Sequence, residues 1–397
     1  MKRILFVHQV SFIGGASYCL LNLLKEIDRE VYEPIVLLKN DGPLVEELNR
    51  LNINVDFMPD LTIAPYNMPF WRIYTLKGYC QVLNSKKNFK KALEKLKPDI
   101  VYFNNVFLYP YLKVSYELGI KSVIHIREHW PINEHVFQFD WLKKSVQKYA
   151  DRVVAINTYS AQMIPDITQK TTIVYDWIDL SERYQKHDMK DLIGEKPEGL
   201  KIFLYSGGFQ KIKGTLEVLE IFSKYKKPNY RLLLLGGDIE SIYNDFYGII
   251  KKNLAKIGVK SPGMRMIELM QKDNNIIGVP STYYIKDILE KSYCMLSFFT
   301  IPHANLALAE SIIQQLPVIA ARTEESEEYS FNGKYAWLFP LGNKEAFANC
   351  FCKVEECYES MKVALEQGSK DVATLFDKDI NANRFNNVLN SLEKEEC

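Results

Sequence analysis

A glycine-rich segment with two lysines lies between residues 206 and 214, directly after an apolar run that predicts a buried strand. It reads Ser-Gly-Gly-Phe-Gln-Lys-Ile-Lys-Gly, places Gly207 and Gly208 ahead of Lys211 and Lys213, and is followed by a helical pattern. Glycine allows close approach to a ligand, and a helix amino terminus favours an anion. A lysine there is unfavourable unless an anion lies beside it. The segment predicts a diphosphate site with Lys213 as a ligand; the alternative is a pair of solvated lysines.

Glycines also follow two other apolar runs that predict strands. Gly14 and Gly15 come after the first run, which ends near His8, and Gly237 follows a run of four leucines. Ligands of α/β proteins bind at the carboxyl edge of a parallel sheet. We therefore predict that these glycines contact the ligand, whereas the alternative is a simple turn at the end of each strand.

Glu310 follows a segment that contains His303, Asn305 and Leu306, and it lies near the start of an apolar helical pattern. That pattern ends just before a strand pattern beginning at Pro317. A carboxylate can accept hydrogen bonds from two adjacent ribose hydroxyls. The alternative is a glutamate that interacts with the dipole at a helix start. We expect Glu310 to hold a ribose and the other three residues to lie beside the same ligand.

Polar residues follow two further strand patterns in the first half of the chain, at residues 100–103 and 122–126. The side chains at these two ends are Asn104, Asn105, His125, Arg127, Glu128 and His129. Because side chains alternate along a strand, His125, Arg127 and His129 are expected on one face. The ends of parallel strands meet at one edge of a sheet, so these residues are predicted to line the same site.

Apolar runs alternate with amphipathic segments, and the series runs twice. Nearly continuous apolar runs predict strands buried on both faces, and strand–helix alternation predicts parallel sheets. We expect an α/β chain with two Rossmann-like domains, at residues 1–185 and 186–375, joined through the polar segment 181–200. A terminal helix within 376–397 is expected to pack on the first domain. The predicted strands are Arg3–His8, Glu33–Leu38, Asn54–Met58, Ile100–Phe103, Ser122–Ile126, Arg152–Ala155, Thr172–Val174, Lys201–Tyr205, Tyr230–Leu235, Asn275–Ile277, Cys294–Phe298, Pro317–Ala321 and Ala336–Phe339.

The composition is that of an ordinary cytoplasmic protein. Hydrophobic residues make up 47% and charged residues 25%, and a net charge of +1 argues against nucleic-acid binding. The seven cysteines are odd in number and irregularly spaced, which favours reduced thiols. The apolar run at residues 4–7 is too short for a secretion signal, and no stretch approaches the roughly 18 apolar residues of a membrane span.

A basic run lies on a predicted helix downstream of an aromatic segment. The run contains Lys86, Lys87, Lys90 and Lys91, and the aromatic segment spans residues 68–74. Such a combination favours peripheral contact with anionic lipid at the inner face of the cell membrane; the alternative is a solvated helix face.

The sequence Asp377-Lys378-Asp379 has the form of an Asp-x-Asp metal motif. It precedes a predicted helix, so we interpret Asp377 as a helix cap and predict no metal site.

Together, these motifs resemble the GT-B retaining glycosyltransferases of family 4, and the resemblance covers nearly the whole chain. It is carried by the Gly-Gly-Ala loop at 14–16, the segment 174–179, the pair Lys213-Gly214, Glu310, and the pair at 317–318. None of these motifs is specific for the family on its own, but their occurrence together in this order is specific. The resemblance implies two Rossmann-like domains with parallel sheets that face each other across a cleft.

The chain departs from the family pattern at several positions. Gly208 stands in place of the arginine that clamps the diphosphate, and Pro302 in place of the first glutamate of the Glu-x7-Glu pair. Asn305 and Gln315 each replace a glycine, Glu324-Glu325 replace a Gly-Gly pair, and Arg127 takes the position of a histidine. Either the donor is unusual or catalysis is weaker.

The resemblance implies transfer of a hexose, with retained configuration and without a metal, from a UDP- or GDP-sugar to a glycan or lipid-linked acceptor. Bacterial surface polysaccharide synthesis is the implied role. Lys213 and backbone N–H groups near 207–209 and 305–306 would stabilise the leaving diphosphate, while Gly14, Gly15, Gly207, Gly208, Gly237, Val279, His303, Asn305, Leu306 and Glu310 would bind the donor. The first domain would bind the acceptor, through Asn104, Asn105, His125 and Glu128, and the second would bind the nucleotide sugar. Arg127 and His129 would act with Lys213 and Glu310 in catalysis. The alternatives are a non-catalytic GT-B subunit that binds a glycan or a partner enzyme, and a nucleotide-sugar epimerase.

Overall fold

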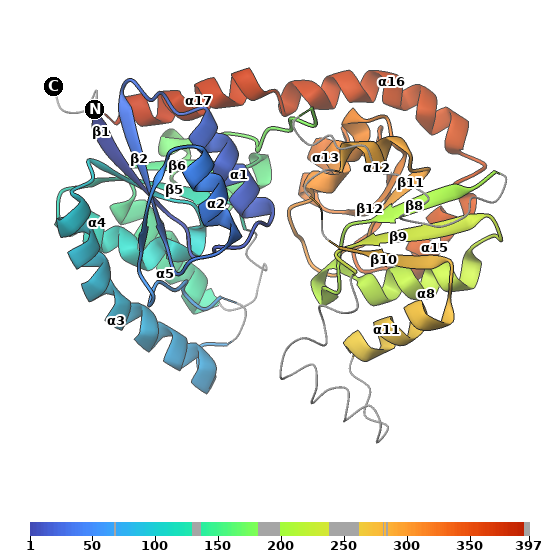
Figure 1. Cartoon of the computed structure of the whole chain (residues 1–397), viewed down its shortest axis with the longest axis horizontal. Helices are drawn as coiled ribbons and strands as arrows, with labels where there is room; N and C mark the ends of the chain where they lie inside the picture. Colours follow the sequence, from blue (N-terminus) through green and yellow to red (C-terminus); the bar gives the residue numbers. More distant parts are fainter. Residues whose placement is uncertain are drawn as a thin grey trace. The chain divides into compact units, whose positions relative to one another are not determined.

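The protein consists of two compact units in a computed structural model (Figure 1). The described residues are 1–66, 69–128, 136–181, 199–237, 262–280, 282 and 285–392. The first unit comprises residues 1–177 together with those from 376 onward, and the second comprises 178–375. The division therefore falls after Trp177, whereas the sequence analysis places the domain boundary after residue 185. Most of the polar segment expected to join the domains lies outside the described residues.

The first unit is built on a seven-stranded sheet of order β3-β2-β1-β4-β5-β6-β7, and every neighbouring pair is parallel. All seven strands expected in this half are present, with small shifts at their ends. Their bounds are β1 Lys2–Val7, β2 Tyr32–Leu38, β3 Asn54–Phe57, β4 Ile100–Phe103, β5 Lys121–Ile126, β6 Arg152–Ala155 and β7 Thr171–Ile173. The central strands are buried on both faces, which explains their continuous apolar runs.

Helices cover both faces of this sheet. One face packs against α1 (Gly15–Lys25), α2 (Pro43–Arg50) and α17 (Lys378–Ser391). The other packs against α3 (Ile73–Leu96), the 3₁₀ helix η1 (Val106–Tyr111), α4 (Leu112–Glu117) and α5 (Val136–Tyr149). The short elements α6 (Thr158–Gln162) and η2 (Thr168–Lys170) lie near β6 and β7. Asp377 accepts a hydrogen bond from Ile380 N at 2.8 Å, so the prediction of a helix cap is confirmed.

The second unit has a parallel six-stranded sheet of order β10-β9-β8-β11-β12-β13. Its strands, all expected from the sequence, are β8 Lys201–Tyr205, β9 Tyr230–Leu235, β10 Ile276–Val279, β11 Cys294–Ser297, β12 Val318–Arg322 and β13 Trp337–Pro340. Its helices are η3 Lys211–Lys213, α8 Thr215–Tyr225, α11 Pro262–Lys272, α12 Lys286–Glu290, α13 Leu306–Ile313, α14 Glu324–Tyr329, α15 Lys344–Lys353 and α16 Tyr358–Leu375. Side chains of α8, α11 and α15 pack on one face of the sheet.

Strand order reverses at one point in each sheet. In the first unit, β1 lies between β2 and β4; in the second, β8 lies between β9 and β11. A crevice opens at the carboxyl ends of the strands at such a switch point, and α/β proteins bind ligands there. The expected site residues lie at or after the ends of β1, β4 and β5 in one unit and of β8, β9, β10 and β11 in the other.

All six described cysteines are free thiols. No helix in the described part of the chain combines the length and the hydropathy that crossing a bilayer requires.

Candidate functional site

His8 and Asn104 meet at the switch point of the first unit, directly after β1 and β4. Asn104 Nδ2 lies 3.2 Å from His8 Nδ1, and the other ring nitrogen of His8 lies 3.0 Å from Ser17 Oγ in the first turn of α1. Burial lowers the pKa of His8 to about 3, with a further contribution from the charge of Arg127. His8 is therefore a neutral imidazole that fixes the start of α1 to the sheet.

Arg127 is held between Asn104 and Asp176. Its Nε donates to Asn104 Oδ1 at 3.0 Å, and its Nη1 lies 2.5 Å from each carboxylate oxygen of Asp176. The side chain of Arg127 is only 4% exposed and that of Asp176 17%. Among the described residues, the buried Nη2 of Arg127 has no hydrogen-bond partner. This arginine therefore carries a compensated charge and one free donor at the carboxyl edge of the sheet.

Glu128 is bound by the loop that follows β4. Its carboxylate accepts hydrogen bonds from Asn105 Nδ2 and, at 3.2 Å, from Val106 N. Burial raises the pKa of Glu128 to about 7, although the hydrogen bond from Val106 and the charge of Arg127 act in the opposite direction. A half-buried carboxyl that titrates near neutrality is typical of functional sites.

His125 points into the core rather than to this network. It is fully buried on β5, and its Nδ1 lies 2.8 Å from the hydroxyl of Tyr102. The structure thus brings Asn104, Asn105, Arg127 and Glu128 together at the edge of the sheet. His125 binds Tyr102 instead, and the charge of Arg127 adds to burial in lowering the pKa of His125. His129 lies outside the described residues.

Gly14 and Gly15 form the start of α1. Gly14 is the residue that precedes the helix, and its carbonyl accepts from Tyr18 N at 2.9 Å. A Cβ added at Gly15 would meet no atom within 4 Å, so the space beside this residue is open. The first turn of α1 contains no acidic residue, which leaves its amino terminus suited to an anion.

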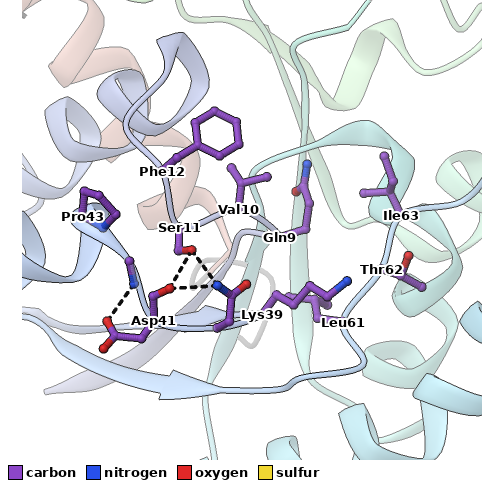
Figure 2. Close-up of a pocket in the computed structure, with 12 residues that line it drawn as sticks. Gln9, Val10, Ser11, Phe12, Lys39, Asp41, Pro43, Leu61, Thr62 and Ile63 are labelled. Carbon is purple, nitrogen blue, oxygen red and sulfur yellow. Dashed lines mark hydrogen bonds between the residues drawn. The ribbon is translucent and has the colours of Figure 1, made fainter. Parts of the chain in front are cut away.

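A pocket of about 530 Å³ opens beside these residues, at the ends of β1, β2 and β3. On one side, Ser11 Oγ donates to Asp41 O at 3.1 Å and accepts from Asn40 Nδ2 at 3.2 Å (Figure 2). Gln9, Lys39 and Thr62 provide polar groups on the other side (Figure 2). The remaining lining is mostly apolar and comprises Val10, Phe12, Gly42, Pro43, Leu61 and Ile63. The three loops that line this pocket carry no common motif, so the pocket could not be predicted from the sequence.

In the second unit, hydroxyl groups hold the glycine-rich loop after β8. Tyr205 OH donates to Lys213 O at 2.7 Å and lies 3.1 Å from Thr215 Oγ1, which donates to Gly208 O at 2.8 Å. Gly214 has φ +68°, and a Cβ there would lie 2.2 Å from Phe298 Cδ1. Glycine at this position therefore allows the loop to close against β11.

Lys213 and His303 lie near each other at the second switch point. Thr300 N donates to Ile212 O at 3.0 Å and joins the loops that carry them. Burial lowers the pKa of Lys213; burial, with the charge of Lys213, lowers the pKa of His303 to about 4. No carboxylate of a described residue forms a salt bridge with Lys213. A largely buried ammonium beside a neutral imidazole forms a favourable place for an anion.

Two of the backbone N–H groups expected to bind the diphosphate are already used. Gly208 N donates to Leu235 O at 3.1 Å, and Asn305 N donates to Glu325 Oε1 at 3.0 Å. Gly208 also has φ +54°, a conformation that disfavours the arginine of the family pattern. Both amides thus join neighbouring strands and loops in this structure.

Glu310 lies beyond the first turn of α13 and is buried. This position argues against the interpretation as a helix-start glutamate, since α13 has no acidic residue in its first turn. Leu306 begins the helix, and Asn305 caps it by accepting from Leu308 N at 3.3 Å.

Gly237 and Val279 lie at the ends of β9 and β10. Gly237 N donates a hydrogen bond to Val279 O at 3.1 Å.

The amino-terminal part of the chain matches a family model. Residues 13–182 match the model described as Glycosyltransferase Family 4. No curated protein sequence gives a significant match.

Solved structures match the chain over its full length. HepE of Anabaena in complex with UDP-glucose has 17% identity and a TM-score of 0.72, covering 98% of this chain and 100% of its own. A glycosyltransferase from Rickettsia africae has 17% identity and a TM-score of 0.71, with 98% of each chain covered. Sucrose-phosphate synthase from Thermosynechococcus elongatus has 14% identity and a TM-score of 0.73, with 100% of each covered. The expected GT-B fold is confirmed.

Proposed function

This chain carries a glycosyltransferase family 4 domain at residues 13–182 within a GT-B fold, and we propose that it transfers a sugar from a nucleoside diphosphate sugar with retention of configuration. The largely buried ammonium of Lys213 supports this proposal most strongly. Burial lowers its pKa, no described carboxylate forms a salt bridge with it, and the ordered loop 206–214 fixes its position. An anionic diphosphate would supply the negative charge that is missing beside this ammonium.

The donor occupies the edge of the second sheet in this proposal. Lys213 contacts the diphosphate, His303 lies beside it, and Glu310 binds the ribose hydroxyls. Gly237 and Val279 lie at the ends of neighbouring strands and contact the base. UDP is the favoured nucleotide, since HepE was crystallised with UDP-glucose, and GDP is the alternative.

Transfer proceeds by substitution on the front face of the sugar. The acceptor oxygen bonds to the anomeric carbon as the bond from that carbon to the diphosphate breaks, and the acceptor proton passes to a diphosphate oxygen. Lys213 stabilises the charge that develops on the leaving group. No metal ion takes part in this scheme.

The first unit binds the acceptor in this proposal. The pocket lined by Gln9, Lys39 and Thr62 combines hydrogen-bonding groups with apolar side chains, and both can contact a sugar ring. The oxygen of the Gln9 side chain is buried without a hydrogen-bond partner among the described residues, so it can accept from an acceptor hydroxyl. Arg127 and Glu128 lie at the same edge of the sheet. A glycan or lipid-linked acceptor, cytoplasmic transfer and a role in bacterial surface polysaccharide synthesis complete the proposal.

A non-catalytic GT-B subunit is the second candidate. The amide of Asn305 is occupied by Glu325, and glycine replaces the diphosphate arginine at Gly208, which together remove two expected donor contacts.

Thermal stabilisation by nucleotides tests the proposal. UDP, GDP and ADP, with their glucose conjugates, are added to the wild-type chain and to the Lys213→Ala and Glu310→Ala variants. Lys211→Ala and Glu324→Ala are the matched controls, because both side chains are exposed. The donor site is supported if a nucleotide stabilises the wild type and both controls but neither of the two test variants. Binding of a nucleotide sugar without transfer or hydrolysis favours the non-catalytic subunit, and no stabilisation by any nucleotide refutes the donor site.

A further inference from the structure

Large apolar side chains are exposed along the first half of α3, just before it, and at the start of α5. Trp71, Ile73 and Tyr74 are 74%, 81% and 80% exposed. Leu83, further along the same helix, is 60% exposed. Phe137, at the start of α5, is 69% exposed. A group of exposed apolar side chains on adjoining elements is typical of a surface that contacts a partner or a membrane, whereas single exposed apolar residues are common. We name these five residues the apolar patch.

Ring contacts join the two elements that carry this patch. The ring of Trp141 on α5 lies 5.1 Å from that of Phe70 and 5.5 Å from that of Tyr79 on α3, both with nearly perpendicular planes. Edge-to-face packing of this kind is favourable. The patch is therefore supported by an ordered aromatic cluster rather than by a loose loop.

The outer face of α3 continues from apolar to basic residues. Ile73 and Leu83 lie on this face, and Lys87 and Lys91 follow at helical spacing. The opposite face is buried against the sheet through Val82, Phe89 and Leu93. One side of a single helix thus presents apolar side chains at its beginning and ammonium groups in its second half.

The charge of this segment differs from that of the whole chain. Residues 72–95 contain seven basic side chains and one acidic side chain, a net charge of +6, whereas the full chain has +1. Lys90 pairs with Glu94 and Lys95 with Asp56. Lys87 and Lys91 are exposed, and no described carboxylate forms a salt bridge with either. The segment therefore retains unpaired positive charge next to the apolar patch.

We propose that this face binds the surface of an anionic lipid bilayer, with the apolar patch inserted among the head groups and Lys87 and Lys91 over the lipid phosphates. Tryptophan and tyrosine favour the boundary between lipid and water. Basic side chains on the same helix are attracted by anionic lipid, and the two contributions add.

Vesicle sedimentation tests this proposal without donor or acceptor, so its outcome is independent of the proposed glycosyl transfer. Wild-type chain is mixed with vesicles of phosphatidylcholine alone or of equal parts phosphatidylcholine and phosphatidylglycerol. We expect binding to the anionic vesicles that weakens as salt is raised, and at least roughly tenfold weaker binding to the neutral ones. Equal binding to both, or binding to neither, would overturn the proposal.

Two variants and two controls identify the surface. Ile73→Ser with Tyr74→Ser removes apolar contacts, and Lys87→Gln with Lys91→Gln removes charge; each is expected to weaken binding to anionic vesicles by roughly tenfold or more. Val363→Ser (68% exposed) and Lys353→Gln with Lys370→Gln alter exposed residues of the second unit and are expected to bind as wild type. Wild-type binding by both patch variants would contradict the proposal. So would concentration-dependent self-association that is lost in the apolar variant while vesicle binding persists.

Discussion

A single terminal nitrogen of Arg127 lies 2.5 Å from both carboxylate oxygens of Asp176. The pair joins the end of β5 to the segment that follows β7, across 49 residues of sequence. Burial alone would lower the pKa of Arg127, but the charge and hydrogen bond of Asp176 more than offset it, and the pKa is raised. The arginine is therefore charged inside the first unit, and the carboxylate of Asp176 compensates this charge.

Removal of that partner should destabilise the first unit. We expect Asp176→Asn to lower the free energy of unfolding by about 3 to 5 kcal/mol, because it leaves a buried charge without compensation. The control is Asp56→Asn, which breaks the exposed pair with Lys95 at 2.7 Å and should cost no more than about 1 kcal/mol. Urea unfolding measures both. If both variants lost the same free energy of unfolding, burial of the Arg127–Asp176 pair would not increase its contribution to stability.

Gly214 and Gly119 provide a matched test of the loop after β8. Both have positive φ, +68° and +70°, but a Cβ at Gly214 would lie 2.2 Å from Phe298 Cδ1, whereas one at Gly119 would meet nothing within 4 Å. We expect Gly119→Ala to cost about 1 to 2 kcal/mol for its backbone alone. Gly214→Ala should cost about 2 kcal/mol more, because Phe298 must also move. Urea unfolding that gives the two variants the same stability would contradict this packing argument.

The strands could be predicted from the sequence because their apolar runs are nearly continuous. Such runs mark strands buried on both faces, as Phe6 on β1 and Leu234 on β9 are. The prediction for Lys213 has a similar local basis, since this residue stands in a glycine-rich strand-to-helix loop. In each case the signal lies within a few consecutive residues.

Contacts between distant residues could not be predicted in this way. Asp176 as the partner of Arg127, and Glu325 as the acceptor for Asn305 N, depend on how loops from different strands meet. The presence of Glu324-Glu325 in place of the family's Gly-Gly pair was the one sequence feature that pointed to the contact between Glu325 and Asn305. No rule of spacing connects these two positions. The position of His125 in the core followed from the partner strand, where Tyr102 binds its ring.

Glu128 should make stability depend on pH. Its pKa is raised by burial from 4.5 to about 7, so the unfolded chain releases this proton at lower pH than the folded chain does. The stability contributed by this group is complete below pH 4.5 and is lost as the pH rises through about 7. The free energy of unfolding of wild type, relative to Glu128→Gln, should fall by up to about 3 kcal/mol between about pH 5 and about pH 8.

Urea unfolding of both proteins at each pH measures this difference, and groups common to both cancel. Exposed Glu117→Gln is the control and should show no such trend. A constant difference between wild type and Glu128→Gln would mean that the carboxyl is not perturbed by burial.

Tyr205 should position Lys213 through the loop backbone. Its hydroxyl, buried at the end of β8, donates to Lys213 O at 2.7 Å and lies 3.1 Å from Thr215 Oγ1. Tyr205→Phe removes these bonds and should cost about 1 kcal/mol of stability. If Lys213 binds the donor diphosphate, the variant should also bind nucleoside diphosphate several-fold more weakly, since the ammonium is less well placed.

Tyr102→Phe separates the two effects. Its hydroxyl is equally buried in the first unit and lies 2.8 Å from His125 Nδ1, so its loss should cost a similar stability. Calorimetric titration with nucleoside diphosphate should give the wild-type dissociation constant for this control and a raised one for Tyr205→Phe. Equal dissociation constants for both variants would restrict Tyr205 to a structural role, because the loop would then hold Lys213 in place without it.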